Sequence, residues 1–337
     1  MFDFGQKCAA VALLVLTPLA ALAQTPETVT PRTAWGDPDL QGVFDYATIT
    51  PMQRPEQYAD REYLTAEEAA TLEQGAEARD LGAAEAPARR AQAGENVGAY
   101  NNFWMDWGTK VVEGRRTSLI VDPPNGRFPA LTPAGAAEAK LRKGFGATMP
   151  ADDHLEMGYG DRCLAVHGLP FIPLPYNSTV QFFQTPDHVA IYGESNRVWR
   201  IIPLDPDDAP HGIRQWLGDT RGHWDGDTLV VETTDFSNLL QQVGAGLGIR
   251  RMEERFTRES DGLISYEFTL DDPTKWTEPY TVAVSMRKIE GLVYEVACHE
   301  GNYALENILR CARAVDGTPE APVKEPGALC FDCEPPR

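Results

Sequence analysis

Hydrophobic and polar residues alternate with a period of two from residue 180 onward, which is the pattern of half-buried β-strands. The alternating segments are short, regularly spaced and separated by turn residues, as in antiparallel barrels and sandwiches. The predicted strands are residues 180–184, 188–192, 197–203, 215–217, 223–224, 228–233, 253–258, 263–270, 280–286 and 293–298. The pattern therefore predicts a mainly β protein.

Two of the predicted connections are tight hairpin turns. Asp225-Gly226 and Asp261-Gly262 each lie between two predicted strands, and glycine adopts the positive φ angles that such turns require. Residues 302–315 then return to a helical pattern. Together these signals predict an antiparallel, lipocalin- or calycin-like β-barrel with an elaborated N-terminal region and a C-terminal helix.

The chain before residue 150 has helical signals and little alternation. Thr65 and Glu68 form a capping box that opens a helix, Thr132-Pro133 starts a second one, and residues 115–124 contain one short strand. We therefore predict four parts. They are a signal peptide (1–23), an N-terminal arm and helices that pack on the barrel (24–150), the barrel with its closing helix (151–316) and a Pro- and Cys-containing tail (317–337).

The first 23 residues have the three parts of a secretory signal peptide. Lys7 lies in the n-region, residues 9–23 are apolar, and Ala21-Leu22-Ala23 is an A-x-A cleavage site. The apolar stretch is shorter than the ~20 residues that a membrane-spanning helix needs. We therefore expect a periplasmic or secreted protein that is soluble and does not span the membrane.

The charge of the chain excludes one class of partner. The formal net charge is −20, and no basic patch interrupts the acidic residues. Nucleic acids and anionic membrane surfaces are therefore poor partners.

The cysteines fit an exported protein, in which disulfides persist. Cys163, Cys298 and Cys311 lie in the barrel region, and their pairing does not follow from the sequence. Cys330 and Cys333 lie in the Pro-rich tail, where we expect a local disulfide loop rather than a redox pair or a metal site.

The sequence has no strong catalytic signature: phosphate-binding glycine loops, a nucleophile elbow and a His-Glu-x-x-His helix are all missing. His223 and His299 are the best acid–base candidates, because a carboxylate, Asp225 or Glu300, stands close to each in sequence. A histidine at a strand end is often only a structural hydrogen-bonding group. The histidine spacings match no zinc pattern, so we expect no metal and no cofactor.

Arginine and aromatic residues are further candidates for a ligand-binding or catalytic role. Arg200 and Arg255 could point into the barrel and hold a carboxylate or phenolate, although surface ion pairs explain most arginines equally well. Large rings could line a pocket for an aromatic or otherwise hydrophobic small molecule, or could belong to the core. The candidate substrate-binding residues are Trp104, Trp107, Tyr192, Trp224 and Trp276.

Four segments carry a resemblance to a known family. Residues 117–124 (TSLIVDPP), 161–164 (DRCL), 213–231 (IRQWLGDTRGHWDGDTLVV) and 297–303 (ACHEGNY) resemble a widespread, largely uncharacterised family of secreted bacterial proteins. That family is associated with γ-formaldehyde lyases that act on lignin-derived aromatic dimers. The resemblance covers roughly residues 30–315 and carries over no catalytic residue.

The resemblance implies a cofactor-independent carbon–carbon lyase that releases formaldehyde and a stilbene. In that hypothesis His223 or His299 is the base, Arg200 or Arg255 stabilises a phenolate, and the aromatic residues enclose the rings. The alternative is a periplasmic binding or carrier barrel for a hydrophobic small molecule. A structural accessory protein of the cell envelope is a third possibility.

Overall fold

The computed structural model describes residues 30–86, 105–141, 162–164, 169–194, 198–204, 212–237, 249 and 251–316. The predicted signal peptide, the candidate Trp104 and the tail with Cys330 and Cys333 lie outside the described residues.

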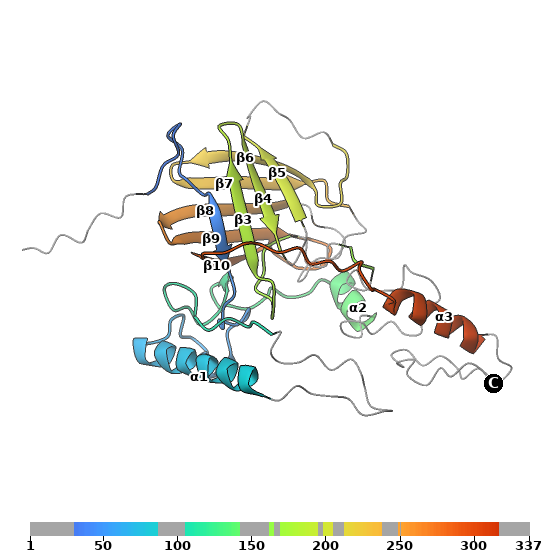
Figure 1. Ribbon diagram of the computed structural model, residues 1–337. Helices are drawn as coiled ribbons and strands as arrows, with labels where there is room; N and C mark the ends of the chain where they lie inside the picture. The colour runs from blue at the N-terminus through green and yellow to red at the C-terminus, as the bar shows by residue number, and fades with distance from the viewer. Residues whose placement is uncertain are drawn as a thin grey trace, which may run out of the picture.

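Nine antiparallel strands form a nearly closed barrel of the lipocalin-like type, which confirms the predicted fold class (Figure 1). Their order around the barrel is β5-β4-β3-β1-β10-β9-β8-β7-β6, and a short strand, β2, pairs with β10 beside this path. The strands are β1 (Gly42–Asp45), β2 (Ile120–Asp122), β3 (Thr179–Gln184), β4 (His188–Gly193), β5 (Val198–Pro203), β6 (Asp219–Asp225), β7 (Thr228–Thr234), β8 (Arg251–Ser260), β9 (Leu263–Asp271) and β10 (Tyr280–Lys288).

As far as the described residues show, the barrel is open at one seam, between β5 and β6, which lie close together without pairing. Gly222 of β6 permits the close approach, since a Cβ at this position would lie 2.7 Å from a methyl carbon of Ile202 on β5. The seam is therefore closed by side-chain packing instead of backbone hydrogen bonds.

The interior of the barrel is filled by the hydrophobic members of the alternating strands. In β8, Met252 and Phe256 are fully buried while Glu253 and Thr257 are only partly buried, and β9 alternates in the same way. Aromatic rings interlock across the core; those of Phe256 and Tyr266 stack at 4.7 Å. The barrel is consequently packed through most of its length.

Most strands match the predicted segments, with three exceptions. Residues 293–298 form no strand, and residues 215–217 contribute only a bridge between Gln215 and Phe236. The third exception is β1, a strand that was not predicted. It lies in the predicted N-terminal arm and pairs with both β3 and β10. The barrel therefore begins at residue 42, earlier than the range of 151–316 that the sequence predicted.

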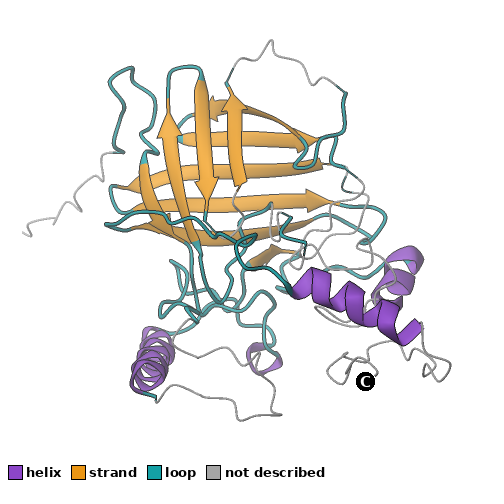
Figure 2. Cartoon of the chain, turned by 45° about the vertical axis from the view of Figure 1, so that its right-hand side comes forward, coloured by secondary structure: helices purple, strands orange, loops and turns teal. Residues whose placement is uncertain are grey.

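The helices lie at one end of the barrel (Figures 1 and 2). The predicted capping box is present at α1 (Ala66–Glu85), where Thr65 Oγ1 accepts a hydrogen bond from the Glu68 amide. Thr132 starts α2 (Pro133–Leu141) by accepting a hydrogen bond from the Gly135 amide. The remaining helices are a 3-10 turn, η1 (Glu56–Tyr58), and the predicted C-terminal helix α3 (Ala304–Asp316). Among the described helices, none has both the length and the hydrophobicity needed to cross a bilayer.

One disulfide bond, between Cys163 and Cys298, joins residues 135 positions apart in the sequence. It settles the pairing that the sequence left open for these two cysteines. The bond ties the chain just before β3 to the segment between β10 and α3.

Candidate functional site

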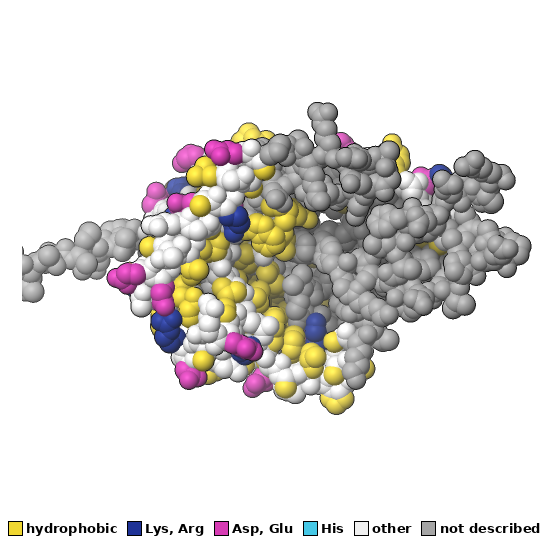
Figure 3. All heavy atoms as spheres, turned by 90° about the horizontal axis from the view of Figure 1, so that it is seen from below, with side chains coloured by type: hydrophobic (Ala, Val, Ile, Leu, Met, Phe, Trp, Pro, Cys, Tyr) yellow, Lys and Arg dark blue, Asp and Glu magenta, His cyan; other side chains and the backbone are white. Residues whose placement is uncertain are grey.

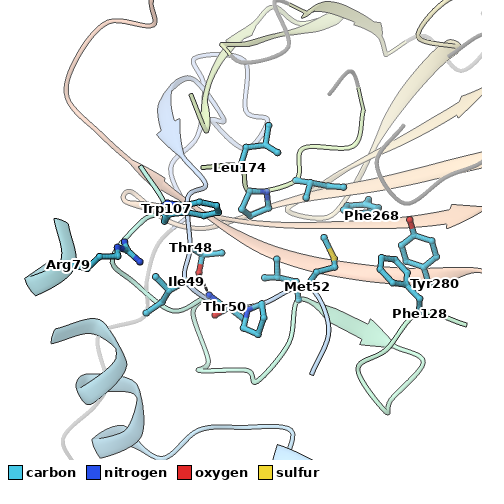
Figure 4. A pocket seen from close by; sticks show the side chains of 14 residues that line it. Thr48, Ile49, Thr50, Met52, Arg79, Trp107, Phe128, Leu174, Phe268 and Tyr280 are labelled. Atoms are coloured by element: carbon cyan, nitrogen blue, oxygen red, sulfur yellow. Dashed lines mark hydrogen bonds between the residues drawn. The ribbon is translucent and has the colours of Figure 1, made fainter. Parts of the chain in front are cut away.

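A pocket of about 520 Å³ opens where the barrel end faces α1 (Figure 4). Its wall is largely apolar and comes from segments far apart in the sequence. The lining residues are Thr48, Ile49, Thr50, Pro51, Met52, Arg79, Trp107, Leu119, Phe128, Ile172, Pro173, Leu174, Phe268 and Tyr280. In the view from below, hydrophobic side chains gather at the centre of this face, and acidic side chains lie mostly toward its edge (Figure 3).

The segment after β1 forms one wall of the pocket and is held by its threonines. Thr48 Oγ1 donates a hydrogen bond of 2.7 Å to the carbonyl oxygen of Lys110, and Thr50 Oγ1 accepts one of 3.0 Å from the Val112 amide. Both hydroxyls are therefore used to fasten this wall to the segment that carries Trp107.

The inner end of the pocket is aromatic. Phe128 stacks on Trp276 at 4.9 Å and meets the ring of Tyr280 edge-on at 5.0 Å. Burial raises the pKa of Tyr280 above its ordinary value, and the nearby carboxylate of Asp272 adds to the shift. Tyr280 therefore stays protonated at neutral pH and contributes to the pocket as a neutral ring.

A short segment entering the barrel end forms the opposite wall. Leu169 and Phe171 of this segment are buried in the core, and Ile172 to Leu174 continue into the pocket lining. The Phe171 amide donates a hydrogen bond of 3.3 Å to the hydroxyl oxygen of Tyr266. The position of this wall is thus linked to the barrel interior.

Tyr266 belongs to a buried polar network. Its hydroxyl donates to Glu254 Oε1 at 2.7 Å, and Arg200 donates to both oxygens of Glu254, at 3.1 and 2.6 Å. Side chains of Arg200 and Glu254 are 3% and 0% exposed. Burial and the adjacent Glu254 raise the pKa of Tyr266 well above its ordinary value. Because Arg200 is on β5 and Glu254 on β8, the ion pair crosses the interior and braces the strand at the open seam.

Arg200 therefore points inward as predicted, whereas Arg255 does not. Arg255 lies on the outer face of β8, 37% exposed, and pairs with Asp225 at 3.0 Å. The prediction of an inward orientation was wrong for Arg255, because consecutive residues of a strand face opposite sides and its buried neighbours are Glu254 and Phe256.

The two candidate histidines are exposed and do not line the pocket. His223 is on the outer face of β6, and His299 lies in a turn before α3. Neither side chain faces the barrel interior, so the pocket does not bring them together.

The candidate aromatic residues separate into different environments. Trp107 lines the pocket and is 47% exposed, while Trp276 lies behind its aromatic end. Trp224 packs against the core inside the barrel. Tyr192 is on the outer face, where its ring stacks on that of Trp199 at 4.6 Å.

One carboxyl group close to the pocket titrates near neutrality. Asp45 ends β1, and its Oδ1 accepts a hydrogen bond of 2.8 Å from the Ala47 amide. Burial raises its pKa to about 6, Asp106 and Glu194 add to the shift, and the Ala47 amide and Arg287 oppose it. Asp45 precedes the lining residue Thr48 by three positions in the sequence and is not itself part of the lining.

Four residues of the pocket and of the buried network were not among the predicted site residues: Arg79, Phe128, Glu254 and Tyr266. Glu254 and Tyr266 could have been found from strand alternation, since each lies in register with buried hydrophobic residues. Arg79 and Phe128 lie in segments without such a pattern. Within the described residues, no three His, Cys, Asp or Glu side chains are grouped so that they could hold a metal ion.

Comparison with known proteins adds no family assignment. No family model matches this chain, and no curated protein matches it significantly.

Proposed function

We propose that this protein binds a hydrophobic, aromatic small molecule in the pocket at the barrel end. The observation that carries the proposal is a preformed cavity of about 520 Å³ whose wall is mostly apolar and includes four aromatic side chains. Pockets of roughly 300–1,000 Å³ with such walls are typical of small-molecule sites, and barrel mouths are a common place for them. The net charge of −20 makes neutral or weakly charged ligands the more suitable class.

The composition of the lining favours binding over catalysis. Its hydroxyl groups, at Thr48 and Thr50, are committed to the backbone, and the raised pKa of Tyr280 removes it as a base at neutral pH. Asp45, the carboxyl with a pKa near neutrality, is outside the lining. These facts support a binding or carrier barrel ahead of a lyase.

Titration with N-phenyl-1-naphthylamine, a neutral dye that fluoresces in apolar sites, tests the binding proposal. Trp107→Ala should weaken dye binding about tenfold, because an aromatic ring at a binding site contributes about 1–3 kcal/mol. Trp199→Ala is the matched control, since Trp199 is also exposed but lies on the outer barrel face. Equal affinities for the two variants would refute the pocket as the binding site.

The carbon–carbon lyase implied by the family resemblance is tested with the same protein. Incubation with lignin-derived aromatic dimers, with and without chelator, is followed by formaldehyde release and stilbene absorbance. Turnover that survives chelation and is lost in His223→Ala or His299→Ala would establish the lyase and make the exposed histidines functional. Ligand retention without turnover would support the carrier.

Export to an oxidising compartment is part of the proposal. The bond between Cys163 and Cys298 supports it, because structural disulfides persist mainly in exported proteins.

A further inference from the structure

The pocket has opposite chemistry at its two ends. Arg79 of α1 lies at one end beside Trp107, and Phe128 and Tyr280 lie at the other (Figure 4). Between them Met52 and other apolar side chains line the wall. A ligand that fills the pocket along its length would therefore have one charged or polar end and one hydrophobic end.

The guanidinium of Arg79 is held in place by two partners, and part of its hydrogen-bond donors is still unused. Its Nε and Nη2 contact Asp80 Oδ1 at 2.8 and 2.7 Å, and Nη2 also donates to the carbonyl oxygen of Gly108 at 3.0 Å. Within the described part of the chain, Nη1 has no hydrogen-bond acceptor. Since Nη1 carries two N–H groups, Arg79 can donate to a ligand without breaking either existing contact.

Two of the neighbouring acids on the same helix are paired with another cation and not with Arg79. Glu73 and Glu77 both accept hydrogen bonds from Lys110 Nζ, at 3.2 and 2.9 Å, and the first of these acids also accepts from the Val111 amide. These bonds raise the pKa of Lys110, the one to Glu77 most. The local acids are therefore paired with a separate cation, and Asp80 is the carboxylate that contacts Arg79.

We infer that the pocket takes an amphipathic monoanion, an aryl carboxylate, with its carboxylate on Arg79 Nη1 and its rings against Phe128 and Tyr280. This inference rests on the proposed binding function and specifies its ligand class. A carboxylate supplies the acceptor that Nη1 lacks, and charge-assisted hydrogen bonds of this kind are stronger than neutral ones. A single negative charge suits one arginine in a protein of net charge −20, which would repel a dianion more strongly.

Displacement of the bound dye by two matched ligands tests the inference. Biphenyl-4-carboxylate and biphenyl-4-carboxamide have the same rings and differ in charge. The unmodified protein should bind the carboxylate about tenfold more tightly than the amide, since a hydrogen bond to a charged group contributes about 1.5–3 kcal/mol before screening at a partly exposed site.

Arg79→Gln should reduce the carboxylate preference, which is the ratio of carboxylate to amide affinity, to about one. Arg79→Lys should keep part of the preference, which a purely structural role of Arg79 would not predict. Arg255→Gln is the matched control, because Arg255 is a similarly exposed, carboxylate-paired arginine that is not part of the pocket lining. It should retain the full preference.

Three results would overturn the inference. If the unmodified protein binds amide and carboxylate equally, or if Arg79→Gln keeps the preference, the ligand class is wrong although the pocket still binds aromatic molecules. If neither biphenyl compound nor the dye binds, the proposed function fails and the inference fails with it.

Discussion

Replacement of Asp45 by asparagine should stabilise the protein at neutral and alkaline pH and have little effect in acid. The carboxyl group has a pKa of about 6 in the folded protein against an ordinary value of 3.8, chiefly because it is buried. Its Asp106 and Glu194 neighbours raise the pKa further, and Arg287 lowers it. Ionisation of Asp45 therefore destabilises the fold.

The size and pH range of the effect follow from proton linkage. Between pH 4 and pH 6 the folded state binds a proton at Asp45 that the unfolded state has released, so the free energy of unfolding falls as pH rises. The difference between the two pKa values corresponds to about 3 kcal/mol, which is lost progressively across this range and is fully lost above pH 6. Asparagine resembles the protonated acid and can still accept from the Ala47 amide.

Urea unfolding of the unmodified protein and Asp45→Asn, at several pH values from 4 to 8, measures this effect. The stability difference between them should be close to zero at pH 4 and approach about 3 kcal/mol at pH 8, while contributions from other groups cancel in the difference. Asp187→Asn is the control, because the hydroxyl of Thr185 lowers the pKa of this exposed carboxyl and the effect should have the opposite sign. A stability difference for Asp45→Asn that does not change with pH would refute the reasoning.

Two further predictions concern what holds the barrel together. Glu254→Gln should lower the free energy of unfolding by about 3–5 kcal/mol in urea unfolding, because it leaves the buried Arg200 without a counter-charge. Arg200→Met combined with Glu254→Leu should recover part of that loss, while the Tyr266 hydroxyl, which donates to Glu254, loses its acceptor. A loss in Glu254→Gln of only about 0.5–1.5 kcal/mol, the contribution of an ordinary hydrogen bond, would contradict the argument from charge. Cys163→Ala with Cys298→Ala should cost about 2–5 kcal/mol, since the bond restrains a long segment of the unfolded chain, and unchanged thermal unfolding would contradict this.

Strand alternation identified the barrel because most strands bury one face. Segments such as residues 263–270 carry a full set of alternating hydrophobic residues, and the structure places β9 there. β1 is four residues long and was missed, since so short a segment shows almost no period. Residues 293–298 are rich in strand-forming residues but form no strand, because pairing depends on a neighbour that the sequence does not specify.

The candidate site was predicted less well than the fold. Alternation in β8 indicates that Glu254 faces inward and Arg255 outward, yet both arginine candidates were chosen for their charge. The pocket could not be predicted, because its wall is assembled from a helix, two barrel strands and irregular segments that meet only in three dimensions. Of the proposed aromatic residues that the structure describes, Trp107 alone belongs to the lining.

The open seam between β5 and β6 lies where the number of strands rules out an antiparallel pair. Along a path of nine antiparallel strands the direction alternates, so the first and the last strand run the same way. An antiparallel barrel closes completely only with an even number of strands, and nine strands leave two parallel edges facing each other. One added strand, antiparallel to both edges, would complete the ring without changing any existing pairing. The seam is therefore the position at which this barrel could gain a strand by insertion and grow wider while keeping its present register.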